Sequence, residues 1–490
     1  MSPENILLVG SLLLLVSIVA GKTSSRFGVP TLILFLIVGV LAGSEGIGGI
    51  YFDNPRIAQF IGIVALNFIL FSGGLDTNWQ VIKPIVWRGI SLSTIGVFIT
   101  ALTVGIFAYY ILNFSFLEGL LLGSIVSATD AAAVFSILRT RGIKLKGKVG
   151  AVLEFESGSN DPMAYFLTIT LTGIIASGKF DGWHFLLLFI QGFLIGGAMG
   201  YIMGRFSHWL INNIKLDSDG LYPVLVLGLA MFTYSATHVI GGNGFLAIYL
   251  SALVLGNRDF IHKRSLVRFY DGQAWLMQII LFLTLGMLVF PSRVIPIIGT
   301  GLLIAAFLVF IARPIGVFIS LAFAKTSIRS KLFISWVGLR GGVPIVFATY
   351  PMIAGLDKAG MIFNLVFFIS VTSVLLQGTT LPLVAKWLGV TEPPEEPKKV
   401  PAIPVNSEIK VITLNNESAV IGKKIVDLHF PVSVNIISIK RNGKYMLPTG
   451  ADNLESGDRL LLLSDNEQEL MSVLDLLGKK QITPVPDSAS

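Results

Sequence analysis

The chain has 490 residues, of which 53% are hydrophobic and only 13% are charged, whereas soluble domains carry about 25% charged residues. The net charge is +7, but the basic residues lie in short segments between long apolar runs, which argues against a nucleic-acid partner. The sequence contains no cysteine, which excludes disulfides, thiol catalysis and Cys-ligated metal sites. The composition therefore predicts a polytopic membrane protein.

Apolar segments recur along the first 390 residues, and a helix needs about 20 apolar residues to cross a bilayer. The first segment has no basic residue before it and no small-residue cleavage site after it, so we expect a retained helix rather than a signal peptide. The sequence predicts thirteen spans, near 5–21, 30–48, 57–74, 85–112, 116–138, 149–177, 183–204, 221–240, 243–256, 273–290, 294–323, 331–354 and 360–388.

The basic residues between these spans alternate in number. Loops that follow odd-numbered spans contain 18 Lys and Arg, and loops that follow even-numbered spans contain 4. Because positively charged loops stay in the cytoplasm, the alternation predicts an amino terminus outside and a carboxyl terminus in the cytoplasm. We expect this arrangement in a plasma membrane of the bacterial inner-membrane type.

The composition changes after the last span. Residues 391–404 form a charged, proline-rich linker after the transmembrane domain 1–390. Residues 405–482 alternate as a small α+β domain in the cytoplasm, with Asn442-Gly443 as a hairpin turn, and 483–490 are predicted to be a disordered tail. The predicted strands are 408–414, 432–440, 444–447 and 458–463, and the predicted helices are 418–428 and 466–477.

A few ionisable residues fall at mid-membrane depth, where charge is costly and usually functional. The alternative is a set of buried ion pairs that only fix the register of the helices. These residues are Asp130, Glu154, Glu156, Asp161, Arg313 and Arg340.

Two predicted spans are interrupted near these charges. The fifth reads Ser127-Ala-Thr-Asp130, and the twelfth reads Gly338-Leu-Arg-Gly-Gly-Val-Pro344, in which two glycines and a proline disfavour regular helix. Interrupted helices an odd number of spans apart favour two inverted repeats, as in secondary transporters, although close helix packing would also explain the glycines. We predict an all-α membrane protein with inverted repeats and interrupted helices 5 and 12.

The sixth span carries the densest cluster of polar residues. Helical spacing places Glu154, Ser157 and Asp161 on one face. Together with Asp130 of the preceding span, Asp161 could form an oxygen site for an alkali cation, because carboxylates and hydroxyls are hard ligands. A carboxylate that binds either a proton or a cation, never both, would exchange the two.

These motifs resemble the monovalent cation:proton antiporter family, in its NhaP and cell-volume-regulation branch. The resemblance rests on Thr129-Asp130, Glu156-Ser-Gly-Ser-Asn160-Asp161 and Gly338-Leu-Arg340-Gly. It implies that Asp161 binds cation and proton, supported by Thr129, Asp130, Ser157 and Asn160, and that Glu156 and Arg340 form a structural salt bridge. It further implies an electroneutral, homodimeric antiporter that works by alternating access. Pro162 departs from the small residue that is frequent after the Asn-Asp pair.

The carboxyl-terminal domain resembles the TrkA-C regulatory module of potassium-handling proteins. The matching segments are Val420-Ile-Gly422-Lys, Arg441-Asn-Gly443 and Leu454-Glu-Ser-Gly457-Asp458. The resemblance implies regulation, a dimer contact or a small nucleotide-type ligand, and it favours K⁺ over Na⁺ as the exchanged cation. We expect no cofactor.

Four rival functions can be compared with the sequence. A Na⁺/H⁺ antiporter would use the same fold and the same residue types, so the sequence leaves K⁺ and Na⁺ open. A cation channel would need a carbonyl filter loop such as Thr-Val-Gly-Tyr-Gly, and an intramembrane aspartyl protease would need Gly-x-Gly-Asp, and the chain contains neither motif. A transport-dead sensor would not need the mid-membrane carboxylates. We therefore expect a transporter, not an enzyme.

Overall fold

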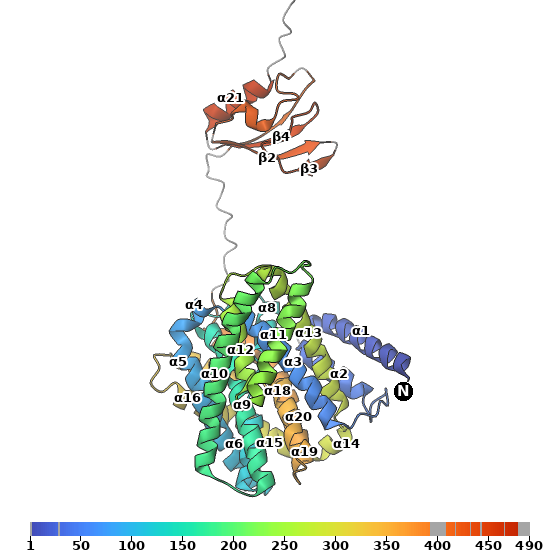
Figure 1. The fold of residues 1–490 in the computed structure, drawn as a ribbon, viewed down its shortest axis with the longest axis vertical. Coiled ribbons are helices and arrows are strands. Elements are labelled where there is room, and N and C mark those ends of the chain that lie inside the picture. Colours follow the sequence, from blue (N-terminus) through green and yellow to red (C-terminus); the bar gives the residue numbers. More distant parts are fainter. Residues whose placement is uncertain are drawn as a thin grey trace, which may run out of the picture. The chain divides into compact units, whose positions relative to one another are not determined.

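The structure is a computed structural model that describes residues 2–27, 30–392, 408–416, 418–431, 433–441, 443–464 and 466–478. The chain divides into two compact units, Met1–Glu392 and Pro393–Ser490, whose parts are drawn in Figure 1.

The first unit is helical throughout its described regular elements. It contains short 3₁₀ and π segments (labelled η) in addition to α-helices. In chain order the elements are α1 (Pro3–Phe27), α2 (Thr31–Ala42), α3 (Pro55–Asp76), α4 (Trp79–Ile82), η1 (Lys83–Ile85), α5 (Val86–Ser91), η2 (Leu92–Gly96), α6 (Val97–Leu112), α7 (Phe116–Ile125), α8 (Ala131–Thr140), α9 (Val149–Ser177), α10 (Gly182–Asn213), α11 (Leu221–Val239), α12 (Gly244–Gly256), α13 (Lys263–Met287), α14 (Pro291–Val294), η3 (Ile295–Ile297), α15 (Ile298–Phe307), η4 (Leu308–Ala312), α16 (Arg313–Ser320), α17 (Ile328–Trp336), α18 (Gly342–Phe347), α19 (Thr349–Ile353) and α20 (Ala359–Trp387).

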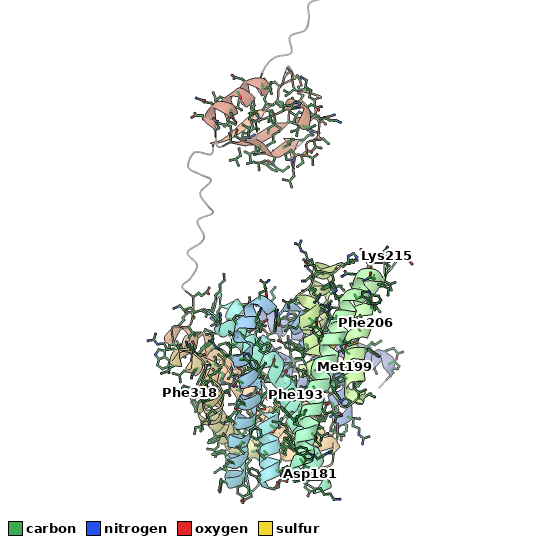
Figure 2. All side chains as sticks on the ribbon, turned by 60° about the vertical axis from the view of Figure 1, so that its left-hand side comes forward. Asp181, Phe193, Met199, Phe206, Lys215 and Phe318 are labelled. Atoms are coloured by element: carbon green, nitrogen blue, oxygen red, sulfur yellow. The ribbon has the colours of Figure 1, made fainter. Side chains whose placement is uncertain are left out.

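Each predicted span coincides with one helix or with a run of shorter ones. Among the described residues, seven segments are long and apolar enough to cross a membrane, judged by length and composition alone. Four shorter apolar helices accompany them. Figure 2 shows one of the long helices, α10, extending from near Asp181 at one end of the unit to near Lys215 at the other. The count of thirteen crossings stays a prediction.

An internal repeat supports the predicted inverted halves. The fourth predicted span runs as α4, η1, α5, the π segment η2 and α6, and the eleventh runs as α14, η3, α15, the π segment η4 and α16. The second residue of each 3₁₀ segment is proline, Pro84 in η1 and Pro296 in η3. Two spans seven apart therefore share the same order of helix types, as two related halves require.

The fifth and twelfth spans are both broken, as predicted. Residues 126–130 separate α7 from α8, and residues 337–341 separate α17 from α18. The two breaks contact each other, because the Asp130 N–H donates to the Leu339 carbonyl oxygen at 2.8 Å. Extended backbone at this depth lies against protein, as it must where lipid offers no hydrogen bonds.

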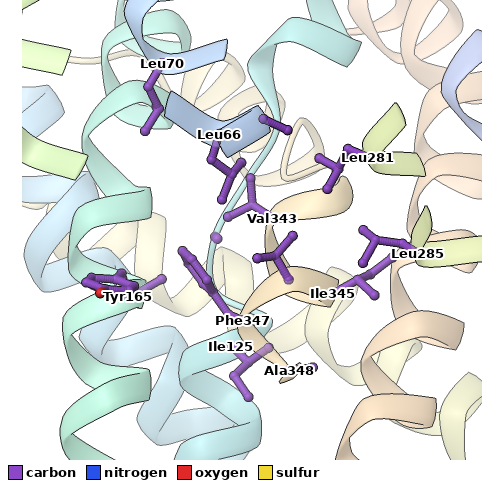
Figure 3. Close-up of a cluster of buried hydrophobic side chains, with 14 of the residues drawn as sticks. Leu66, Leu70, Ile125, Tyr165, Leu281, Leu285, Val343, Ile345, Phe347 and Ala348 are labelled. Carbon is purple, nitrogen blue, oxygen red and sulfur yellow. The ribbon is translucent and has the colours of Figure 1, made fainter. Parts of the chain in front are cut away.

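Apolar side chains pack closely beyond the breaks. Figure 3 shows this buried cluster, in which the rings of Tyr165 and Phe347 lie with centroids 5.7 Å apart. Ile125, Ile345 and Ala348 are fully buried in the same cluster. The cluster joins α7, α9 and α18 into one solid layer.

The second unit contains a four-stranded antiparallel sheet in the order β1-β4-β2-β3. Its elements are β1 (Glu408–Thr413), η5 (Ile425–Leu428), β2 (Val434–Arg441), β3 (Lys444–Met446), β4 (Arg459–Ser464) and α21 (Glu467–Gly478).

The predicted strands and the helix 466–477 are confirmed, but the predicted helix 418–428 is wrong. That segment forms turns and ends in the short η5, and Gly422 has a φ of +78°, which interrupts a helix. Asn442 lies outside the described residues, while Gly443 has the φ of +82° that the predicted hairpin turn needs.

Candidate cation-binding site

The crossing of the two broken helices is held by Arg340. Its Nη1 donates to the carbonyl oxygens of Ser127 at 2.5 Å and Ala128 at 2.8 Å, both in the break before α8. The break leaves such carbonyls without helical partners, and the buried guanidinium satisfies them. Arg340 therefore fixes the backbone that leads to Asp130.

Asp130 is the residue that begins α8. Its Oδ1 accepts a hydrogen bond from the Ala133 N–H at 3.0 Å, which caps the helix. Its Oδ2 lies so close to Gly341 that a Cβ at that position would overlap the carboxylate. Only glycine at 341 allows the second break to approach Asp130.

Polar side chains of α9 tie this helix to the break. Ser157 Oγ donates to the Thr129 carbonyl oxygen at 2.8 Å and accepts from the Ala131 N–H at 2.9 Å. Asn160 Nδ2 donates to the Thr129 hydroxyl oxygen at 2.5 Å. The structure thus brings together Thr129, Ser157 and Asn160, three of the residues that the family resemblance implies for the site.

Asp161 follows this network on α9 and is only 5% exposed. Its Oδ1 has no hydrogen-bond partner among the described residues, and neither does Oδ1 of Asn160. The turn around Pro162 is supported from outside, because Asn243 Nδ2 donates to the Pro162 carbonyl oxygen at 2.7 Å. A buried carboxylate oxygen without a protein partner is suited to a cation or a proton.

A cavity of about 420 Å³ reaches Asp161 and Asp130. Asp76, Arg139 and Asp271 line its wall and are exposed, so they mark the mouth. Apolar side chains of the buried cluster, including Leu66 and Leu281, also line the cavity. The cavity therefore leads from one surface of the unit to the two carboxylates and ends at the packed layer.

The predicted salt bridge between Glu156 and Arg340 is wrong, because Glu156 pairs with Arg313. Glu156 Oε1 lies 2.5 Å from Nη2 of Arg313 in α16, and both side chains are almost fully buried. Arg340 instead serves the backbone carbonyls of the first break. The sequence offered two arginines of similar depth, and only the packing of α16 against the site decides between them.

Three acidic residues of the cavity, Glu154, Asp76 and Asp271, are not among the site residues predicted from the sequence. Glu154 lines it and accepts a hydrogen bond from the Thr77 hydroxyl at 3.4 Å. Its shared helix face with Ser157 and Asp161 was the available signal. Asp76 and Asp271 fall outside the predicted spans 57–74 and 273–290, whereas the structure places them in α3 and α13.

Known proteins resemble the chain over most of its length. A profile of the transmembrane sodium/hydrogen exchanger family matches residues 11–387, and one of the TrkA-C domain matches residues 409–478. The K(+)/H(+) antiporter NhaP of Alkalimonas amylolytica is 41% identical, with 93% of this chain and 80% of that protein covered. The K(+)/H(+) antiporter NhaP2 of Shewanella baltica is 40% identical, with 98% and 84% covered.

A solved structure is similar as well. The sodium proton antiporter MjNhaP1 of Methanocaldococcus jannaschii superposes with a TM-score of 0.68 at 26% identity, covering 79% of this chain and all of that one. The family profile alone spans more than half of the chain. The chain belongs to the sodium/hydrogen exchanger family.

Proposed function

We propose that the protein is a secondary antiporter that exchanges K⁺, Na⁺ or both for H⁺. The single observation that carries this proposal is Asp161, a buried carboxylate with an unpartnered oxygen at the end of a cavity. Asp130 lines the same cavity, and the Thr129 and Ser157 oxygens lie beside it. These are hard oxygen ligands of the kind that alkali cations prefer.

Mutual exclusion at Asp161 is the proposed mechanism. A cation can bind the deprotonated carboxylate, and a proton neutralises the same oxygens. If the unit reorients only with one of the two bound, each turnover moves one cation against one proton, and the exchange is electroneutral. The cavity on one side and the packed layer on the other support alternating access, with the site facing one surface at a time.

K⁺ is the first candidate cation. Two curated relatives at about 40% identity are named K(+)/H(+) antiporters, and the chain carries a TrkA-C domain. Na⁺ is the second candidate, because an archaeal relative at 31% identity is named a Na(+)/H(+) antiporter. Both ions suit the same set of oxygen ligands.

We further propose an inner-membrane homodimer with its amino terminus outside and a regulatory domain in the cytoplasm. The loop charges support this orientation, and the cavity mouth at Asp76 and Arg139 then faces the cytoplasm. The TrkA-C-like domain is the proposed binding site of a small nucleotide-type ligand. No enzymatic step is part of this proposal.

The test is a transport assay in proteoliposomes that hold an imposed pH gradient. A pH-sensitive dye reports proton movement after addition of K⁺, Na⁺ or choline, with and without a voltage clamp by the membrane-permeant anion thiocyanate, so that the Na⁺ and choline trials contain no K⁺. Dissipation by K⁺ or Na⁺, but not by choline, and unchanged by the clamp, is the expected result. Folded protein that responds to neither cation would contradict the proposal.

A further inference from the structure

A second cavity lies at one end of the first unit, away from the transport site. Its volume is about 270 Å³, and it is an open cavity lined by residues of α5, α9 and α17 and of the segments that precede α9 and α17. Buried apolar residues, including Val152 and Leu321, form part of its wall. The charged residues that line it are all basic.

Four basic side chains line this cavity, Arg88, Lys146, Lys148 and Lys325, and none of its described lining residues is acidic. Within the described part of the chain, Arg88, Lys148 and Lys325 have no carboxylate within ion-pair distance. Lys146 donates to the Gly389 carbonyl oxygen at 3.2 Å, which leaves its charge uncompensated. Like charges gathered around one cavity repel each other, so an anion between them would be stabilised.

Neutral donors point to the same kind of ligand. The Thr326 hydroxyl oxygen is buried and finds no hydrogen-bond partner among the described residues, and Thr326 lines the cavity. The 29-residue helix α9 begins here at Val149, after Lys148, without a side-chain cap, so its first N–H groups and its positive dipole end are available. The start of α17 is different, because Ser327 caps it through the Ser330 N–H.

We propose that this cavity, the basic cavity of Arg88, Lys148, Lys325 and Thr326, binds the phosphate group of an anionic ligand. Phosphate offers several acceptor oxygens at once, which suits an arginine fork, two lysines, a hydroxyl and a helix start. The site is separate from the transport site and does not depend on which cation is exchanged.

The surroundings favour a lipid headgroup as the source of the phosphate. Phe323 and Ile328, next to the basic rim in sequence, are exposed by 104% and 69%. Acyl chains would cover such side chains, and anionic lipids are attracted to basic residues on the cytoplasmic side. A soluble phosphate would meet the same cations without covering the apolar residues.

The cavity is also connected to the transport site and to the carboxyl-terminal end of the first unit. Its helix α9 carries Asp161, and the segment with Lys146 is hydrogen-bonded to the end of the unit, through Lys146 N–H to the Val390 oxygen at 2.7 Å. The Glu392 N–H donates to the Lys144 oxygen at 2.8 Å, where the chain leaves for the second unit. A ligand in the cavity would stiffen this segment.

The test measures thermal unfolding of the purified full-length protein in detergent. The probes are phosphatidylglycerol, phosphatidylcholine and inorganic phosphate as its Tris salt, all at constant ionic strength with Tris chloride. The test variant combines Lys148→Gln with Lys325→Gln. The matched control combines Arg264→Gln with Arg268→Gln, two exposed basic residues near the start of α13, on the same predicted side.

We expect a ligand of the right class to raise the Tm of the wild-type protein and of the control by about 2 to 4 °C, and not that of the test variant. A rise with phosphatidylglycerol alone supports a lipid headgroup, and a rise with inorganic phosphate as well supports a soluble phosphate ligand. Three results would overturn the site: no rise with either anion, a rise that survives in the test variant, or an equal rise with phosphatidylcholine. Without ligand, the test variant should unfold at or above the wild-type temperature, since it loses only repelling charges.

Discussion

The polar atoms around Asp161 divide into those with a hydrogen-bond partner in the protein and those without one among the described residues. Ser157 and Asn160 donate hydrogen bonds to Thr129, and these bonds fix the break before α8. The Oδ1 atoms of Asn160 and Asp161 receive nothing from the described residues. A buried polar oxygen without a partner costs free energy, so these two atoms do not stabilise the fold, and the proposed mechanism assigns them to the ligand.

Gly341 is expected to tolerate no side chain. A methyl group there would overlap Asp130 Oδ2, and Asp130 would have to move. Gly341→Ala should therefore lower exchange by about 100-fold, as displacements near 1 Å can do, while the protein still folds. Gly360→Ala in α20 is the control, because its methyl group would meet nothing within 4 Å. Equal activity of both variants in the proteoliposome assay would contradict the steric account.

The pair Glu156–Arg313 leads to a stability prediction. Arg313→Met leaves a buried carboxylate without its cation and should destabilise the fold by about 3–5 kcal/mol. Adding Glu156→Met should recover most of this loss, because two apolar side chains can replace a buried pair. Thermal unfolding of the two variants in detergent measures both effects. If the double variant were no more stable than Arg313→Met, the pair would not be the reason for the loss.

At the scale of elements, the sequence predicted what depends on local chemistry. Glycines and a proline in Gly338–Pro344 predicted the break between α17 and α18. The polar segment 154–161 predicted the helix that carries the site. The partner of Glu156 could not be predicted in the same way, since it depends on how α16 packs against α9. The helix expected at 418–428 failed because its apolar spacing is equally compatible with turns around Gly422.

The second unit contains a partly buried ion pair, Arg441–Asp458, with a predictable pH response. Burial raises the pKa of the Asp458 carboxyl, but hydrogen bonds from Arg441, at 2.8 and 2.7 Å, and from the Glu455 N–H outweigh it and hold the pKa below its usual value. As the pH falls, Asp458 is therefore protonated in the unfolded chain before it is protonated in the folded one. The resulting stability is present above the ordinary Asp pKa of about 3.9 and is lost as the pH falls through the folded value.

Asp458→Asn should remove this acid-dependent part of the stability. Unfolding of the segment 405–482, followed by circular dichroism between about pH 2 and pH 6, measures it. The wild-type segment should lose stability toward the acid end more steeply than the variant. Parallel pH profiles would show that the Arg441–Asp458 pair does not link stability to pH.

At the scale of the whole molecule, exchange and the proposed regulation are assigned to different units. The cavity and its carboxylates lie within Met1–Glu392, which forms a compact unit by itself. A chain ending at Glu392 should therefore keep exchange in proteoliposomes and lose only its dependence on a ligand of the TrkA-C-like domain. The cut preserves the backbone contact between Glu392 and Lys144. A truncated protein that folds and does not transport would refute this division.

The central claim is that one carboxylate, Asp161, carries both the cation and the proton. Its most direct test is K⁺- and Na⁺-driven proton movement by Asp161→Asn in proteoliposomes, beside Asp217→Asn, which changes an exposed aspartate on the surface. The account predicts that Asp161→Asn folds, elutes like the wild-type protein and exchanges neither cation, while Asp217→Asn exchanges normally. Exchange that survives in Asp161→Asn would contradict it.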